Sequence, residues 1–482
     1  MAHPEAGVVR DPEPAQVPLI VDVDALLGPE QTIEAVFALI RAKPTTIGQL
    51  PVWLARGPPG VRSGLARAAP AGTLGQSLRA DVLAYLRAQR TAGRPVALVG
   101  GEVATAECLA QELRLFDIVW AGDAFAALSP EQRRERLERQ FRAADFDYLA
   151  GRGRDALWRA ARGAWVVAPS ERRLREIAAA SSVRQVFAAP AGAAAEYLRA
   201  LRPHHWIKNL LLLVAVATGH RWPDLRTQAV LLWGLVAFCL CASSNYLLND
   251  LFDLTSDRRH PEIRHRPLAS GLIRPSRAVL LLTVLLVAAL AIAARLSPAF
   301  LGILVAYYLL ITLYSLRLKE VAVLDVFILA GGYALRVAAG AYVVGIRPSM
   351  WLIALCAFLF LSLALIKRYA ELIAIGSTAG PTARVRGYLA SDASLIASQG
   401  VASGYLAVLV LALYTNTSVA QHFYGRHELF WAIALLLLYW INYLWLMARR
   451  GRIAHDPVVF ALQNRTSQWL VIAMAVVTAC AL

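Results

Sequence analysis

Residues 245–271, NYLLNDLFDLTSDRRHPEIRHRPLASG, change abruptly from apolar to charged sequence. An apolar run leads into the stretch, and three aspartates follow it, at Asp250, Asp253 and Asp257. Arginines come directly behind them, at Arg258, Arg259, Arg264 and Arg266. Three carboxylates packed with arginines at the end of a membrane-type apolar run predict a polar site at the edge of a bilayer.

The composition indicates a membrane protein with a soluble part. Of the 482 residues 58% are hydrophobic, and the mean hydropathy is +0.50, which is more apolar than soluble proteins of this length are. We expect a disordered tail at 1–16, an α/β domain at 17–180, a helical linker at 181–200 and an all-α membrane domain at 201–482. The protein is therefore expected to be multi-domain.

The membrane half contains nine apolar runs that can be placed as spanning helices, which need about 20 residues each, and the first and last of these runs are short. They lie at 207–219, 228–248, 278–295, 298–316, 321–344, 350–372, 397–415, 428–447 and 467–482. We expect a polytopic bundle of about nine transmembrane helices. Lys and Arg concentrate in the connections after even-numbered helices, which predicts an inner-membrane protein with a cytoplasmic N-terminal domain and polar site.

The formal net charge of +16 has two candidate explanations. A basic protein can bind nucleic acid, but no aromatic and basic recognition motif accompanies the charge, so we expect no nucleic-acid partner. The distribution of Lys and Arg around a membrane explains the surplus better. The five cysteines have neither disulfide nor metal-ligand spacing and are interpreted as small apolar residues.

The aspartates suggest a metal site. If the helix at 228–248 continues past Asn249, then Asn249, Asp253 and Asp257 follow an i, i+4, i+8 pattern, and Asp250 lies close to them. Carboxylates so close repel one another unless a cation lies between them. Their oxygens suit Mg²⁺ that is also held by the phosphates of a substrate. The alternative is an acidic helix end neutralised by its own arginines.

A second polar cluster lies in YSLRLKEVAVLDVFILAGGYALR, residues 314–336. Tyr314 and Lys319 precede an apolar run that contains Asp325 and, about three turns later, Arg336. Intramembrane charges usually face an interior cavity, so both could face the same one. A structural ion pair between Asp325 and an arginine of another helix is the alternative.

Two shorter motifs add basic residues near the ends of apolar runs. ALIKRYAEL contains Lys367 and Arg368, and LRPHHWIKN contains Lys208 and Asn209 at the entry of the first helix. These residues either bind anions or extend to the membrane interface, as Lys and Arg commonly do there.

The first aspartate motif carries a family resemblance. Asn249, Asp250, Asp253 and Asp257 match the N-D-x-x-D-x-x-x-D motif of the UbiA-type intramembrane transferases, which the chain resembles. The resemblance implies a helical bundle around a cavity, with two Asp-rich motifs that bind Mg²⁺ and a diphosphate. Of the second motif, usually D-x-x-x-D, this sequence has Asp325 and then Leu329. The resemblance assigns the four aspartates as catalytic and makes them, with Asn249, the metal ligands.

The membrane half resembles most closely the decaprenyl-phosphate phosphoribosyltransferase branch of that superfamily. The resemblance is carried by LRPHHWIKNLLL, NDLFDLTSDRRHPEIRHRPLASG, YSLRLKEVAVLDVFILAGGYALRVAAG and KRYAEL. It implies transfer of a phosphoribosyl group from phosphoribosyl pyrophosphate to a polyprenyl phosphate in the bilayer. The expected substrate-binding residues are Lys208, Asn209, Asn249, Arg258, Arg264, Arg266, Tyr314, Lys319, Arg336, Lys367 and Arg368.

Two other functions stay open. A prenyltransferase would use the same aspartates to move an isoprenoid from its diphosphate to an aromatic or other acceptor. A non-catalytic membrane assembly protein would use the soluble domain to recruit partners. A homo-oligomer is compatible with any of these functions.

The N-terminal part shows strand-then-helix patterns typical of a parallel, Rossmann-like α/β sheet. Their order resembles that of haloacid-dehalogenase-like phosphatase domains, in which the two aspartates of D-x-D-G-T act on phosphate. Asp22 and Asp24 match these, but Ala25 and Leu26 replace the G-T pair. Two further motif positions are Gly100, where Ser or Thr is expected, and Asp155, the surviving aspartate of G-D-x-x-x-D. We therefore expect a degenerate domain without phosphatase activity.

Overall fold

The computed structural model describes residues 17–69, 78–122, 128–141, 145–150, 157–167, 170–188, 193–218, 225–260, 263–380, 382–453 and 457–481. The expected tail at 1–16 lies outside these residues. The chain forms two compact units. Unit 1 comprises residues 1–197 together with 250–279, and unit 2 comprises 198–249 and 280–482. The Asp-rich segment therefore packs with the N-terminal part of the chain.

Unit 1 is built on a six-stranded parallel sheet with the strand order β3-β2-β1-β4-β5-β6. The strands are β1 (Leu19–Asp22), β2 (Val96–Val99), β3 (Ile118–Trp120), β4 (Asp147–Ala150), β5 (Gly163–Val167) and β6 (Ser182–Phe187). The prediction of a parallel α/β sheet is confirmed. β1 lies between β2 and β4, so the end of this inner strand places Asp22 at the carboxyl edge of the sheet.

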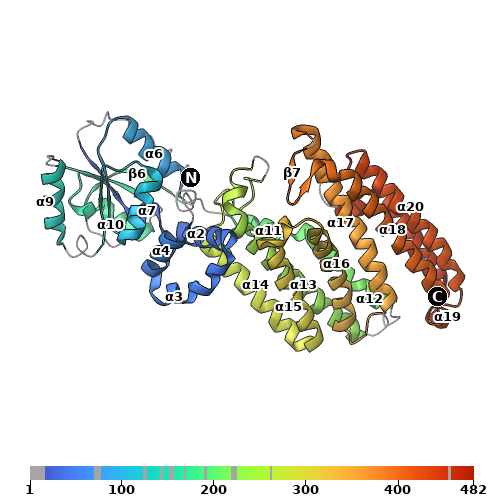
Figure 1. Ribbon diagram of the computed structural model, residues 1–482. Coiled ribbons are helices and arrows are strands. Elements are labelled where there is room, and N and C mark those ends of the chain that lie inside the picture. Colours follow the sequence, from blue (N-terminus) through green and yellow to red (C-terminus); the bar gives the residue numbers. More distant parts are fainter. Residues whose placement is uncertain are drawn as a thin grey trace, which may run out of the picture. The chain divides into compact units, whose positions relative to one another are not determined.

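Helices cover both faces of this sheet (Figure 1). Successive strand residues enter different cores, as Val21 and Ile20 of β1 do, because side chains alternate across a strand. The first face packs against α2 (Pro29–Ala42), α3 (Leu50–Ala55), α4 (Gly57–Ala68), α6 (Ala80–Thr91) and α7 (Val103–Leu113). The second packs against α9 (Pro130–Phe141), η2 (Leu157–Arg159) and α10 (Glu171–Ala178).

The expected helical linker at 181–200 is wrong in its first part. Residues Ser182–Phe187 form strand β6, which pairs with β5 and places Phe187 in the core. Val183, Val186 and Phe187 are residue types that favour strands, and tertiary pairing recruits the segment into the sheet. Helix α11 (Ala194–Leu201) follows it.

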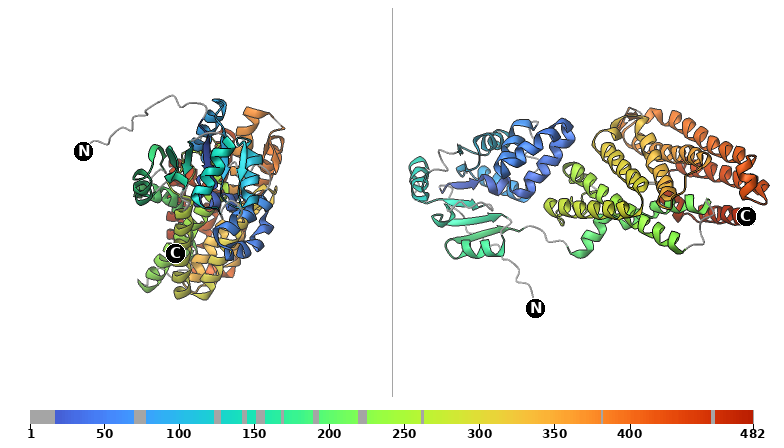
Figure 2. Two further views of the ribbon diagram at one scale, coloured as in Figure 1. Left: turned by 90° about the vertical axis from the view of Figure 1, so that its left-hand side faces the viewer. Right: turned by 90° about the horizontal axis from the view of Figure 1, so that it is seen from below.

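Unit 2 is a bundle of helices that run side by side (Figure 2). The helices that build this half are η3 (Pro203–Leu210), α12 (Leu211–Thr218), α13 (Leu225–Asp257), α14 (Pro275–Leu296), α15 (Pro298–Leu316), α16 (Leu324–Val343), α17 (Met350–Ala379), α18 (Ala393–Thr415), α19 (Ser418–Phe423), α20 (Phe430–Arg449), α21 (Pro457–Gln463) and α22 (Arg465–Ala481). Its two short strands, β7 (Arg384–Val385) and β8 (Tyr388–Leu389), form a hairpin after α17.

Seven helices among the described residues are long and apolar enough to cross a membrane, namely α13 to α18 and α20. At the first and last of the nine expected spans, the described helices are α12, with 8 residues, and α22, with 17, and both are shorter than these seven. Large apolar side chains such as Trp233, Val287 and Leu435 are exposed on the spans. Such exposure suits contact with lipid rather than with water.

Helix α16 contributes to two apolar cores. Val337 packs in the core formed with α17, α18 and α20, whereas Ala339 and Val343 belong to the core formed with α12 to α15. Gly340 lies so close to α12 that a Cβ atom there would come within 1.8 Å of the carbonyl oxygen of Leu212. Glycine thus permits the close approach of these two helices.

Candidate active site

Helix α13 continues without a break to Asp257, which meets the condition for the i, i+4, i+8 pattern of Asn249, Asp253 and Asp257. Its last turns carry all three aspartates of the first motif. Asp250 and Asp257 are buried, whereas Asn249 and Asp253 are half-buried. Asp250 and Asp257 are two turns apart and therefore lie on the same side of the helix.

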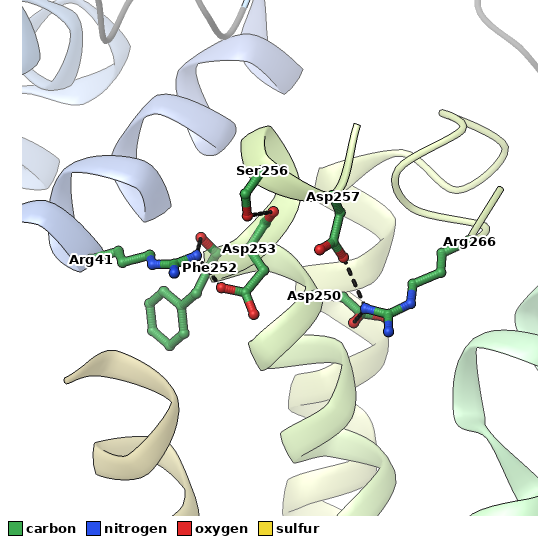
Figure 3. Close-up of polar contacts among 7 residues, drawn as sticks. All are labelled: Arg41, Asp250, Phe252, Asp253, Ser256, Asp257 and Arg266. Carbon is green, nitrogen blue, oxygen red and sulfur yellow. Dashed lines mark hydrogen bonds and ion pairs between the residues drawn. The ribbon is translucent and has the colours of Figure 1, made fainter. Parts of the chain in front are cut away.

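A single arginine joins these two buried carboxylates (Figure 3). The Nη1 atom of Arg266 lies 3.0 Å from Oδ2 of Asp257 and 3.4 Å from Oδ1 of Asp250. The side chain comes from the loop that follows α13. The guanidinium lies between two carboxylates that would otherwise repel each other, which stabilises their charged forms.

The third carboxylate faces a different cation. Nη1 of Arg41, on α2, donates to Asp253 and to the carbonyl oxygen of Phe252 (Figure 3). The hydroxyl of Ser256 donates to the carbonyl oxygen of Asp253 at 2.7 Å. Sequence reasoning missed Arg41, because it lies 212 residues before Asp253 and no local motif marks it.

The residue types of this cluster fit a divalent cation, but their arrangement does not gather around one. In the described part of the chain, no three His, Cys, Asp or Glu side chains lie close enough together to hold a metal ion. Asp250 and Asp257 face Arg266, and Asp253 faces Arg41. The alternative of an acidic helix end neutralised by arginine describes this arrangement, although one of the arginines comes from α2.

The remaining arginines of the segment differ in their surroundings. Arg258, an expected substrate ligand, donates to Oε1 of Glu34 at 2.7 Å and to the carbonyl oxygen of Ala269 at 3.3 Å. Burial raises the pKa of Glu34 to about 7, although Arg258 opposes this shift. Arg264 is exposed.

The second cluster centres on Asp325, which is fully buried at the start of α16. Its Oδ2 atom accepts from Nη2 of Arg368 on α17, and its Oδ1 accepts from the hydroxyl of Tyr388 at 2.6 Å. Arg368 also pairs with Glu371. Asp325 thus forms the structural ion pair that the sequence left as an alternative, and its role as a metal ligand stays a prediction.

The hairpin that carries Tyr388 is held tightly against the chain before α16. The N–H of Val323 donates to the Tyr388 hydroxyl at 2.6 Å. Val323 has φ +68°, an unusual conformation for a β-branched residue that surrounding contacts must maintain. At Gly387, a Cβ atom would lie 2.6 Å from the backbone nitrogen of Ala322. These contacts fix the position of Tyr388 beside Asp325.

Two expected substrate-binding residues, Lys208 and Asn209, lie near a third, the buried Arg336. Its guanidinium donates to Asn209 Oδ1 at 2.9 Å, to the carbonyl oxygen of Gly332 at 2.7 Å and to the hydroxyl of Tyr307 at 2.7 Å. It also lies over the Tyr333 ring, at 5.6 Å from the centroid, and the Lys208 ammonium lies 5.9 Å from the same centroid.

Arg336 and Asp325 have different partners, so the structure does not pair them. Within the described residues the contacts of Arg336 are to neutral acceptors and aromatic faces rather than to a carboxylate. A buried guanidinium of this kind is suited to an anionic ligand. The other expected ligands are less enclosed: Tyr314 accepts from Arg386 at 2.6 Å, and Lys319 and Lys367 are half-buried.

The aspartates of the N-terminal motif have protein partners. Asp22 is buried at the end of β1 and accepts hydrogen bonds from the Asp24 N–H at 2.9 Å and the Tyr148 hydroxyl at 3.3 Å. Asp24 pairs with Arg62 of α4. Gly100, with φ +82°, lies beside Asp22, since a Cβ atom there would be 3.4 Å from Oδ1. No hydroxyl is supplied at this position. Asp155 lies outside the described residues.

Comparison with known proteins identifies the family. Residues 210–467, more than half of the chain, match the UbiA prenyltransferase family. An uncharacterized protein, y4nM of Sinorhizobium fredii, is 30% identical over 95% of this chain and 89% of its own length. The chain belongs to the UbiA prenyltransferase family and is an integral membrane protein of that class.

Other relatives match parts of the chain. The nodulation protein NoeC of Azorhizobium caulinodans is 36% identical over 58% of this chain and 91% of its own length. Decaprenyl-phosphate phosphoribosyltransferase of Mycolicibacterium smegmatis is 41% identical over 36% of this chain and 56% of its own length. A solved UbiA homolog from Archaeoglobus fulgidus, bound to GPP and Mg²⁺, has a TM-score of 0.45, with 19% identity over 59% of this chain and 99% of that chain.

Proposed function

We propose that this chain transfers the phosphoribosyl group of phosphoribosyl pyrophosphate to a polyprenyl phosphate, with assistance from Mg²⁺. The observation that carries the proposal is the 41% identity to the phosphoribosyltransferase of M. smegmatis over 180 residues. The distribution of Lys and Arg around the spans supports an inner-membrane orientation with the polar end of α13 in the cytoplasm.

The reaction breaks the bond between the anomeric carbon and the pyrophosphate oxygen and forms a bond from that carbon to an oxygen of the lipid phosphate. The lipid phosphate is already an anion, so the attack requires no general base. In the proposal Asn249, Asp250, Asp253, Asp257 and Asp325 are candidate metal ligands. A divalent ion bound by the aspartates of α13 would offset the negative charge that develops on the pyrophosphate.

The basic side chains suit the anionic load of the two substrates. Arg266 presents a guanidinium at the aspartates, and the planar fork of arginine matches phosphate oxygens. Arg336 and Lys208 place two further cations in unit 2, which is consistent with a second phosphate site there. An aromatic prenyl transfer would bring fewer anionic groups to the protein.

The proposal is tested with the full chain in lipid nanodiscs. The protein is supplied with Mg²⁺, phosphoribosyl pyrophosphate labelled in the ribose, and decaprenyl phosphate, and a labelled lipid product is sought by mass spectrometry. A parallel sample receives geranyl diphosphate and an aromatic acceptor. Pyrophosphate release with the prenyl donor alone would favour prenyl transfer, the activity after which the UbiA prenyltransferase family is named, and would overturn the assignment.

For the N-terminal domain we propose a haloacid-dehalogenase-like fold that has lost phosphatase activity. Its parallel sheet, with Asp22 at the carboxyl end of β1, supports the fold. The engagement of Asp24 by Arg62 and the glycine beside Asp22 support the loss of activity. The full chain is expected not to hydrolyse p-nitrophenyl phosphate, and hydrolysis that Asp22→Asn abolishes would contradict this.

A further inference from the structure

One face of helix α2 packs against the Asp-rich segment within unit 1. Glu30, Glu34, Phe37 and Arg41 recur at i, i+4, i+7 and i+11, the spacing of a single helical stripe. All four side chains contact residues of the range 250–279. We call this stripe the α2 face.

Each end of the α2 face makes a polar contact of a different kind. Glu30 accepts from the backbone N–H of Ser276 at 2.9 Å and from its hydroxyl at 2.7 Å, which places a carboxylate at the N-terminus of α14. At the other end Arg41 contacts the Asp253 carboxylate. The two contacts between them are the Glu34–Arg258 ion pair and an edge-on contact of Phe37 with Phe252, with ring centroids 5.5 Å apart.

Of the three aspartates at the end of α13, Arg41 contacts Asp253, whereas Arg266 contacts the other two. A divalent cation shared by the three carboxylates would have to draw Asp253 away from Arg41, because two cations cannot approach the same carboxylate without mutual repulsion. The Arg41 and Asp253 side chains are 28% and 15% exposed. Partly exposed ion pairs are weak, so a divalent cation can displace this one.

We propose that Arg41 and a divalent cation compete for Asp253, so that the α2 face holds the Asp-rich motif in a state of low metal affinity. Loading the motif with metal then releases Arg41 and loosens α2 from the segment. The inference rests on the proposed function for its biological meaning. The competition itself is a property of Arg41 and Asp253 and can be measured without substrates.

The test is binding of Mn²⁺, a paramagnetic substitute for Mg²⁺, to the full chain, followed by electron paramagnetic resonance. Arg41→Ala is expected to bind Mn²⁺ about 3–10-fold more tightly than the native chain, because a positive charge beside the ligand is removed. Arg41→Lys, which keeps the charge, should bind as the native chain does. Arg87→Ala, at an exposed position of α6, controls for loss of a distant arginine.

A second measurement covers the case in which Arg41→Ala disturbs folding. In the native chain, Mn²⁺ should increase amide hydrogen exchange in α2, and Asp253→Asn should abolish that increase. Equal Mn²⁺ affinity of the native and Arg41→Ala chains, with α2 exchange unaffected by the metal, would overturn the inference. If Arg41→Ala binds Mn²⁺ more tightly but the native chain shows no transfer from phosphoribosyl pyrophosphate, the competition stands and the proposed function fails.

Discussion

Asp325 of α16 and Arg368 of α17 form an ion pair in which both side chains are fully buried. The pair joins two neighbouring helices of the apolar bundle, where water cannot screen either charge. Removing one partner leaves an uncompensated charge, which costs far more than the pair itself contributes. Asp325 can therefore be indispensable to the fold whether or not it also binds a metal.

Asp325→Asn and Arg368→Gln should each lower the free energy of unfolding by about 3–5 kcal/mol. The measurement is thermal or denaturant unfolding of the purified protein in detergent. The double variant should be more stable than the sum of the single losses predicts, because neither fully buried member of the Asp325–Arg368 pair is left facing an unpaired charge. If Asp325→Asn instead keeps the native stability and loses most of its affinity for Mn²⁺, the result would identify Asp325 as a metal ligand.

Replacing the first-motif aspartates should affect activity more than stability. Asp250→Asn and Asp257→Asn are expected to reduce transfer by about 100-fold or more, because a role in stabilising the leaving group is commonly worth several kcal/mol. Pyrophosphate release as a function of Mg²⁺ concentration measures the effect. Asp81→Asn, on the exposed start of α6, is the control. Near-native turnover in both motif variants would contradict a catalytic role for them.

Glu34 predicts a pH dependence of the α2 contact. Its pKa is raised from 4.5 to about 7 by burial. The folded state therefore favours the protonated carboxyl of Glu34. Its contribution to the free energy of unfolding is complete below about pH 4.5 and is lost as the pH rises through about 7. The native chain should lose stability relative to Glu34→Gln over this window, on the order of 1–3 kcal/mol.

The pH prediction is checked by unfolding the native chain and Glu34→Gln side by side between about pH 5 and pH 8.5. Glu34 pairs with Arg258, and both residues line a cavity of unit 1. The other charged residues that line this cavity are Asp24, Glu30, Arg79 and Arg274. Glu107→Gln, at an exposed carboxylate of α7, controls for general effects of charge. A native chain that gains stability relative to Glu34→Gln as the pH rises would contradict the prediction.

Two glycines of α16 provide a matched test of helix packing. Gly340→Ala should destabilise the bundle by about 1–3 kcal/mol or more, because the new methyl group would meet the Leu212 carbonyl. Gly331→Ala should be neutral or stabilising, since no atom beyond the adjacent backbone of α16 lies within 4 Å of the added carbon and alanine favours the helix. Unfolding midpoints of the two variants give the comparison, and equal midpoints would argue against the close contact of α12 and α16.

The sequence by itself determined the parallel sheet of the N-terminal part and the long apolar spans of the membrane half. Each of these depends on local periodicity or on the length of an apolar run, which neighbouring residues specify. It also identified Asp250, Asp253 and Asp257 as one polar cluster, because helical spacing fixes their proximity. Strand β6 departed from expectation, because pairing with β5 recruited its residues into the sheet.

Only the tertiary structure decided which charges face each other. Arg41 and Asp253, Glu34 and Arg258, and Asp325 and Arg368 are each far apart in the sequence. No local pattern encodes their pairing, because an ion pair depends on which helix faces are brought together by packing. The same packing explains why the aspartates, suited by chemistry to a divalent cation, are held by arginines instead.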